Sequence, residues 1–277
     1  MEKLDTLQKF SNTFANTKKF PVLFLGHGSP MNAIEENEFV NGFRNLSEHL
    51  EMPKAILCIS AHWETKGSFV TAMENPRTIH DFGGFPKALY EVQYPAPGQP
   101  YLAGGIKNLV NKTQIELDLK WGLDHGAWSV IKHLYPKANV PVVQLSLDYS
   151  KKAQDHYSLA KELSVIRQKG VLIIGSGNIV HNLSLVAWDK LNESGYGYDW
   201  ALEANDKMKS FILDGNHKEL INYTAQGKEF QLAIPTPEHF IPLLYVLGMV
   251  DKKEPINIFN DKAVAGSLSM TSIKFGS

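Results

Sequence analysis

The chain has 277 residues, of which 43% are hydrophobic and 21% are charged, and its formal net charge is −1. This composition is typical of an ordinary globular protein, and the near-zero charge excludes the overall basic field that attracts nucleic acid or anionic lipid. No run of about 18 apolar residues occurs, so no membrane span is expected. We therefore expect small-molecule partners, with no nucleic acid and no membrane among them.

The cysteine content and the first residues indicate a compartment. The single cysteine, Cys58, excludes an internal disulfide, and the lack of cysteine pairs excludes a cysteine-rich zinc site. Residues 1–19 are polar and mixed in charge, without the apolar core of a signal peptide. We expect a cytoplasmic protein in which residues 1–277 form one domain and residues 1–19 are an N-terminal extension of it.

Apolar runs of strand length alternate with amphipathic segments along the chain. The first buried strand, 21–26, is followed by a helix within 33–50, and a second strand follows at 55–61. Two strands joined by a helix in this way predict a βαβ unit with a right-handed crossover. The remaining strands are expected at 68–73, 115–119, 140–147, 171–177 and, as an edge strand, 267–275.

Helices occupy the intervals between these strands. Asp124 is placed to cap the helix that follows it or to orient the adjacent His125. Pro237 suits the first turn of a helix that continues through Leu247. This alternation predicts a single three-layer α/β domain with a mostly parallel central sheet and helices on both faces. The other helices are expected at 101–113, 149–169, 200–214 and 217–223.

Residues 74–99 interrupt the alternation of strands and helices. The segment contains four prolines and three glycines with aromatic residues between them, and it is too polar and too broken for core elements. It predicts a long ordered loop. Loops of this length in compact domains are often functional.

Five of the ten histidines stand at the start or end of a predicted element: His27, His62, His125, His181 and His239. Three of them follow strands, and ligands of open α/β sheets bind outside the carboxyl ends of the strands. We therefore expect the five to share one site. Imidazole ligands without cysteine favour a first-row metal that keeps an open coordination position, and histidines beside it can move protons.

Seven ordered motifs resemble those of the 4,5-DOPA extradiol dioxygenase family, which belongs to the class III extradiol ring-cleaving dioxygenases. The resemblance runs from about residue 20 to the C-terminus. It implies one catalytic domain that uses non-haem iron(II) and O₂ to open the ring of a catechol such as L-DOPA. The motifs are Gly26-His-Gly-Ser-Pro-Met31, Ser60-Ala-His-Trp63, Asp81-Phe-Gly-Gly-Phe-Pro86, Tyr94-Pro-Ala-Pro-Gly98, Leu123-Asp-His-Gly126, Gly175-Ser-Gly-Asn178 with His181, and Thr236-Pro-Glu-His239.

The resemblance also implies roles for the five histidines. By position, His27, His62 and His239 match metal ligands of the family, whereas His125 and His181 match the catalytic histidines that move protons. His181 also matches a fourth metal ligand of metal-bound members, so both roles stay open for it. Zn²⁺ is expected to occupy the same site as Fe²⁺, because it binds such ligands more tightly under the usual affinity order.

One departure from the broader class III pattern concerns the third ligand. That pattern has two histidines and a glutamate, whereas here Glu238 and His239 are adjacent. On a helix, consecutive side chains diverge by roughly 100°, so only one of the two is expected to face the metal. We favour His239, following the DOPA-type subfamily, and expect Glu238 to orient an imidazole.

The loop from Thr78 to Gly98 is the expected wall of the substrate pocket. Its aromatic residues Phe82, Phe85 and Tyr94 are predicted to stack on the substrate ring. The alternative is an ordered loop that only covers one end of the sheet, and both interpretations stay open.

Two other functions fit the same residues. A histidine site with an open position also activates water, so a zinc-dependent hydrolase is one alternative, and O₂ consumption with a catechol would discriminate it. A non-enzymatic binding protein like the Memo-type relatives of class III dioxygenases is the other. The complete set of five histidines argues against it, and failure to bind any metal would support it.

Overall fold

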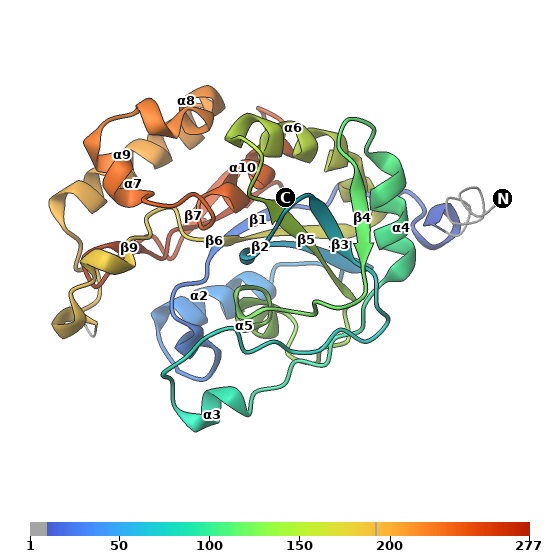
Figure 1. The fold of residues 1–277 in the computed structure, drawn as a ribbon, viewed down its shortest axis with the longest axis horizontal. Coiled ribbons are helices and arrows are strands. Elements are labelled where there is room, and N and C mark those ends of the chain that lie inside the picture. Colours follow the sequence, from blue (N-terminus) through green and yellow to red (C-terminus); the bar gives the residue numbers. More distant parts are fainter. Residues whose placement is uncertain (1–9, 192) are drawn as a thin grey trace.

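The computed structural model describes residues 10–191 and 193–277. At its centre lies an eight-stranded sheet in the order β4-β3-β5-β2-β6-β1-β10-β7 (Figure 1). The four middle strands, β5, β2, β6 and β1, run parallel to one another. The strands of this sheet are β1 (Val22–Gly26), β2 (Ala55–Thr65), β3 (Ser68–Thr71), β4 (Ile115–Asp118), β5 (Val142–Asp148), β6 (Val171–Gly177), β7 (Ile256–Phe259) and β10 (Ser272–Phe275), and β8 (Ala263–Val264) pairs with β9 (Leu268–Ser269) beside it.

Helices cover both faces of the sheet. In Figure 1, α2 and α5 lie below the sheet, whereas α6, α10 and the group α7 to α9 lie above it. No helix within the described residues is long and apolar enough to cross a membrane. The helices are α2 (Glu38–Ser47), α3 (Lys87–Tyr90), α4 (Pro100–Leu109), α5 (His125–Leu134), α6 (Ala153–Leu163), α7 (Asp199–Leu213), α8 (His217–Ile221), α9 (Lys228–Ala233) and α10 (Ile241–Gly248), with shorter 3₁₀ turns at 30–33, 164–169, 183–185, 188–190 and 223–225.

The central strand β2 shows why this arrangement forms. Its consecutive side chains point to opposite faces of the sheet, so Leu57 and Ile59 join the core beneath α6 and α10, while Ile56 and Cys58 join the core beneath α5. A strand that is buried on both faces must be apolar throughout, as this run is. The result is the single α/β domain with two helical layers that the alternation of elements predicts.

The N-terminal segment packs on this domain as far as it is described. Phe10 and Phe14 are buried and stack on each other, with ring centroids 5.3 Å apart. A Cβ atom on Gly105 of α4 would lie 2.4 Å from the Phe10 ring, so the glycine allows the close approach. Residues 1–9 of the predicted extension lie outside the described residues.

Two strand predictions are wrong in their details. Strand β2 continues to Thr65, so His62 lies within the strand and not beyond its end, although the pairing with β5 shifts register between Ile59 and Glu64. The predicted edge strand at 267–275 is divided between β9 and β10, and β10 lies between β1 and β7. Its mostly buried side chains explain this inner position, and β7 forms the edge instead.

Two helix predictions also need correction. The helix expected from Pro237 begins only at Ile241, because residues 237–240 form a turn in which Phe240 N–H donates to Pro237 O at 3.0 Å. The helix expected at 149–169 is α6 followed by a 3₁₀ turn. By contrast, the predicted cap of α5 is confirmed, since the Asp124 carboxylate accepts the Ala127 N–H at 3.0 Å.

The long loop at 74–99 is confirmed as an ordered segment whose only helix is the short α3. It is fastened to the domain through its main chain. Ile79 N–H donates to Leu123 O at 2.7 Å, and Val142 N–H donates to Pro97 O at 2.8 Å. The loop therefore has a defined position beside the N-terminus of α5.

Candidate metal and catalytic site

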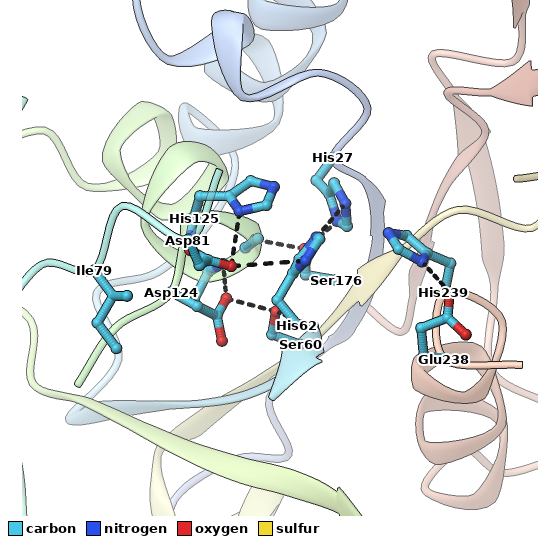
Figure 2. A network of polar contacts seen from close by, with 12 residues as sticks. His27, Ser60, His62, Ile79, Asp81, Asp124, His125, Ser176, Glu238 and His239 are labelled. Carbon is cyan, nitrogen blue, oxygen red and sulfur yellow. Dashed lines mark hydrogen bonds and ion pairs between the residues drawn. The ribbon is translucent and has the colours of Figure 1, made fainter. Parts of the chain in front are cut away.

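The structure brings the five predicted site histidines together at the carboxyl edge of the parallel strands, and Figure 2 shows four of them, His27, His62, His125 and His239. His27 follows β1, His62 lies near the end of β2, and His125 is the first residue of α5. His181 follows β6, and His239 lies in the turn before α10. The residues come from five separate segments, and the parallel packing of β1, β2 and β6 makes them neighbours.

Three of the imidazole rings form a nearly equilateral triangle. Ring centroids are 5.0 Å apart for His27 and His62, 5.2 Å for His27 and His239, and 5.0 Å for His62 and His239. Imidazole nitrogens that share one first-row ion at ~2.1 Å place their ring centroids on the order of 5 Å apart. The spacing of the three rings therefore fits a metal ion.

The candidate ligand atoms of the site also fall into two close groups. In one group, nitrogens of His27, His62 and His125 all lie within 4.8 Å of one another. In the other, nitrogens of His181 and His239 and a carboxylate oxygen of Glu238 do the same. The ligand set predicted from sequence takes residues from both groups. The predicted proton carrier His125 lies closer to His62 than the predicted ligands His27 and His239 do, at 3.9 Å between ring centroids.

His27 has a defined tautomer. Its Nδ1 lies 3.0 Å from Ser176 Oγ, and that hydroxyl donates its only proton to Gly126 O at 2.5 Å. Ser176 must therefore accept a hydrogen bond from the Nδ1–H of His27, which leaves Nε2 with a lone pair. This Nε2 faces Nε2 of His62 at 3.1 Å.

His27 and His62 are held neutral. Burial lowers the pKa of His27 well below its usual value, and the neighbouring His62 lowers it further. Burial likewise lowers the pKa of His62, with His125 as the next cause. Neutral imidazole is the form that binds metals, so no proton has to be removed before an ion can enter.

Glu238 and His239 are paired, with Oε1 of the carboxylate 3.0 Å from Nδ1 of the ring. Burial alone raises the pKa of Glu238, but hydrogen bonds from His239, the backbone and Thr236 lower it to about 2. The ionised carboxylate accepts a hydrogen bond from the Nδ1–H of His239, so Nε2 of His239 carries the free lone pair.

His181 packs against this pair. Its ring is parallel to that of His239 within 9°, with 3.5 Å between centroids. Burial lowers the pKa of His181 to about 3, with His239 adding to the effect. The lone pairs of two stacked rings lie in parallel planes, so they do not converge on one point between the rings.

Two glycines allow this crowding. A Cβ atom on Gly177, at the end of β6, would lie 2.1 Å from His239 O. A Cβ atom on Gly126 would lie 2.5 Å from Ser60 Oγ and 2.7 Å from the His62 ring. Larger residues at these positions would push His239 and His62 out of the cluster.

Asp81 is a site residue that the sequence reasoning missed. It lies in the long loop, and its carboxylate is 2.9 Å from Nδ1 of His125 and 3.7 Å from Nδ1 of His62 (Figure 2). The only signal in the sequence is that Asp81 begins the motif Asp81-Phe-Gly-Gly-Phe-Pro86 in the polar loop. Nothing local in the sequence places that loop against the start of α5.

The three predicted substrate-stacking residues lie in different surroundings. Phe82 packs edge-on against His125, with 5.6 Å between ring centroids, and Phe85 packs on Phe82 at 5.4 Å. Tyr94 is only 2% exposed, and its hydroxyl donates to Tyr135 O at 2.8 Å. The geometry therefore favours Phe82 as a wall of the site and a packing role for Tyr94.

A cavity of about 620 Å³ borders the cluster. This volume is within the range of small-molecule sites, about 300–1,000 Å³. Glu238 lines the cavity and is hydrogen-bonded to His239, whereas none of the five histidines lines the cavity. The charged and titratable residues of its lining are Glu64, Asp148, Tyr149, Lys151, Lys152, His156, Tyr223 and Glu238.

Comparison with known families identifies the fold and the class of enzyme. Residues 21–276 match the family model described as the catalytic LigB subunit of aromatic ring-opening dioxygenase. The chain belongs to this dioxygenase family. The match covers every site residue described above, and it confirms the class of enzyme that the seven motifs resemble.

Individual relatives agree with this assignment. The chain is 45% identical over 265 residues to the 4,5-DOPA dioxygenase extradiol of Escherichia coli (strain K12). This alignment covers 94% of this chain and 96% of that protein. It is 35% identical to the 4,5-DOPA dioxygenase extradiol of Beta vulgaris, over 92% of this chain and 96% of that protein. The crystal structure of an uncharacterized protein from Escherichia coli K12 superposes with a TM-score of 0.81 at 41% identity, covering 93% of this chain and 100% of that one.

Proposed function

We propose that the protein opens the ring of a catechol with O₂, in the extradiol manner, at a metal ion held by His27, His62 and His239. The observation that carries this proposal is the triangle of three neutral imidazoles with a further histidine on each side. When bound, iron(II) would supply the redox chemistry that lets O₂ react with a catechol. We propose Fe²⁺ as the active ion and Zn²⁺ as a competing occupant of the same ligands.

The ligands favour one charge state of the substrate. Three neutral imidazoles add no negative charge to the site. A doubly deprotonated catechol balances a divalent ion without help from the protein. This supports vicinal diols as the substrate class.

Two further histidines are placed to move the protons that such a substrate loses. His125 contacts the ring of His62, and Asp81 accepts a hydrogen bond from Nδ1 of His125. We therefore assign His125 as the base that takes a hydroxyl proton from the substrate. For His181, the parallel stacking on His239 favours proton transfer over metal binding, because stacked rings do not aim their nitrogens at one ion.

The relatives and the cavity together suggest the kind of catechol. The related proteins from Escherichia coli and Beta vulgaris are both named 4,5-DOPA dioxygenase extradiol. The cavity beside Glu238 has room for a side chain on the catechol ring, and charged groups of both signs, among them Glu64 and Lys151, lie on its wall. We therefore propose a catechol such as L-DOPA as the substrate. The lone buried thiol, Cys58, supports a reducing, cytoplasmic setting.

O₂ uptake by protein reconstituted anaerobically with Fe²⁺ tests this function. We expect uptake with L-DOPA and formation of a yellow ring-opened product, and slower uptake with plain catechol. The Zn²⁺-loaded protein serves as the matched control and should consume no O₂. Absence of uptake from fully iron-loaded protein with both catechols would overturn the proposal, and ester hydrolysis by the zinc form would then support the hydrolase alternative.

A further inference from the structure

We propose that Asp81 is the positioning residue of His125, and that its carboxylate selects the tautomer in which Nε2 of His125 is the free base. The consequence for catalysis rests on the proposed function, whereas the tautomer itself does not. The proposal gives the long loop at 74–99 a task other than covering the substrate.

Asp81 holds His125 at two points. One carboxylate oxygen, Oδ1, accepts the backbone N–H of His125 at 2.8 Å, and the other, Oδ2, lies 2.9 Å from its Nδ1. His125 is the first residue of α5, so its N–H has no partner within the helix. A single carboxylate therefore fixes both the backbone and the ring of this residue.

The tautomer follows from the chemistry of the pair. A carboxylate only accepts hydrogen bonds, so Nδ1 of His125 must carry the proton in the contact with Asp81. The neutral ring then has its lone pair on Nε2. Without this partner, the two tautomers of His125 would differ little in free energy, and the base would be present in only part of the molecules.

Within the part of the chain that the structure describes, no other group competes for this contact. His62 Nδ1 is 3.7 Å from Oδ2 of Asp81, which is too long for a hydrogen bond. Asp124 is the other nearby carboxylate, but its oxygens are occupied by the side chains of Ser60 at 2.6 Å and Gln144 at 2.7 Å. Asp81 is therefore committed to His125.

The loop holds Asp81 in place from both sides. Before it, Ile79 N–H donates to Leu123 O at 2.7 Å, and Ile79 O accepts the indole N–H of Trp128 at 2.8 Å. After it, Phe82 packs on the face of the site at His125. These contacts tie the loop to the start and the second turn of α5, so the carboxylate and the ring it holds share one rigid frame.

The substitution Asp81→Asn tests the proposal, because the amide nitrogen donates to Nδ1 and should move the proton of His125 to Nε2. Long-range ¹H–¹⁵N spectra of metal-free and Zn²⁺-loaded protein near pH 8 read the tautomer directly, with His125→Gln identifying the signals. We expect protonated Nδ1 in the wild type and protonated Nε2 in Asp81→Asn. In the iron enzyme we expect kcat to fall on the order of 10²–10⁴-fold, with KM and bound metal unchanged.

Controls separate this role from a structural one. The substitution Asp189→Asn, at an exposed residue, should change neither the spectra nor kcat. Asp81→Ala removes the acceptor with a smaller side chain, and mixed tautomers are expected, which keeps the test available if Asp81→Asn folds poorly. An unchanged His125 tautomer in Asp81→Asn would overturn the proposal, as would loss of metal in step with kcat. If the wild-type iron enzyme opens no catechol, the proposed function fails while the spectra still decide the role of Asp81.

Discussion

The carboxylate of Glu238 accepts a hydrogen bond from Nδ1 of His239, the next residue in the chain, with 3.0 Å between the atoms. Adjacent side chains diverge on a helix, but α10 begins only at Ile241, and the pair lies in the turn before it. In the turn, the two side chains meet. A carboxylate in this position would orient His239 in the proposed metal site.

We predict that Glu238→Gln weakens metal binding without abolishing it. The carboxylate fixes the His239 tautomer and raises the basicity of its Nε2, and removal of such partners costs about 10–100-fold in metal affinity. Competition with a chelator for Zn²⁺ measures the change, and exposed Glu193→Gln is the matched control. If Glu238→Gln instead loses as much affinity as His239→Ala, Glu238 is itself a ligand.

The fold was largely predictable from local patterns. The buried runs that form β1 and β6 were found because a strand covered on both faces must be apolar along its whole length. The edge strand β7 was missed because its residues are only partly buried and carry no continuous apolar run. The place of β10 between β1 and β7 depends on pairing with distant strands, which no local pattern encodes.

The site was predictable in its histidines and in the adjacent partner Glu238, and not in the partners that lie far away in the chain. Each histidine stands at or near the end of an element, and the fold brings such ends to one edge of the sheet. Asp81 and Ser176 set the tautomers of His125 and His27, but they come from segments 44 and 149 residues away in the chain. Contacts of that kind depend on tertiary packing, so spacing in the sequence does not reveal them.

His125→Gln should separate proton transfer from metal binding. If His125 is the base, the variant keeps its metal and loses on the order of 10²–10⁴-fold in ring-opening kcat. Metal analysis and O₂ uptake on the same sample measure both quantities. Because His125 also groups with His27 and His62 within 4.8 Å, loss of metal is the informative opposite result and would make it a ligand.

Gly177→Ala should damage the site through the backbone alone. The new Cβ would lie 2.1 Å from His239 O, which also accepts the N–H of Asn178 at 2.9 Å, so the turn bearing His239 has to move. We expect a loss on the order of 1–3 kcal/mol in the free energy of unfolding, together with weaker Zn²⁺ binding. Gly83→Ala is the control, since its Cβ would have no atom within 4 Å. Equal stability of the two variants would contradict the close packing of β6 and the turn.

His156, on the wall of the cavity, links stability to pH. It lies on α6 and is buried against α10, where its Nδ1 lies 3.1 Å from the Tyr245 hydroxyl. Burial lowers its pKa to about 4, although Asp148 and Asp155 act in the opposite direction and Lys151 acts with burial. The folded protein therefore keeps His156 neutral at pH values where the unfolded chain already binds a proton.

The sign of the effect follows from this difference. Because the folded pKa of about 4 is below the usual value of 6.5, the contribution of His156 to stability is complete above pH 6.5 and is lost as the pH falls towards 4. Between pH 7 and pH 5 the loss should be about 2 kcal/mol. Urea unfolding of metal-free wild type and His156→Gln at both pH values measures it, and the variant should lose that much less stability on acidification. Parallel pH dependence of the two proteins would show that His156 is protonated without cost in the folded state.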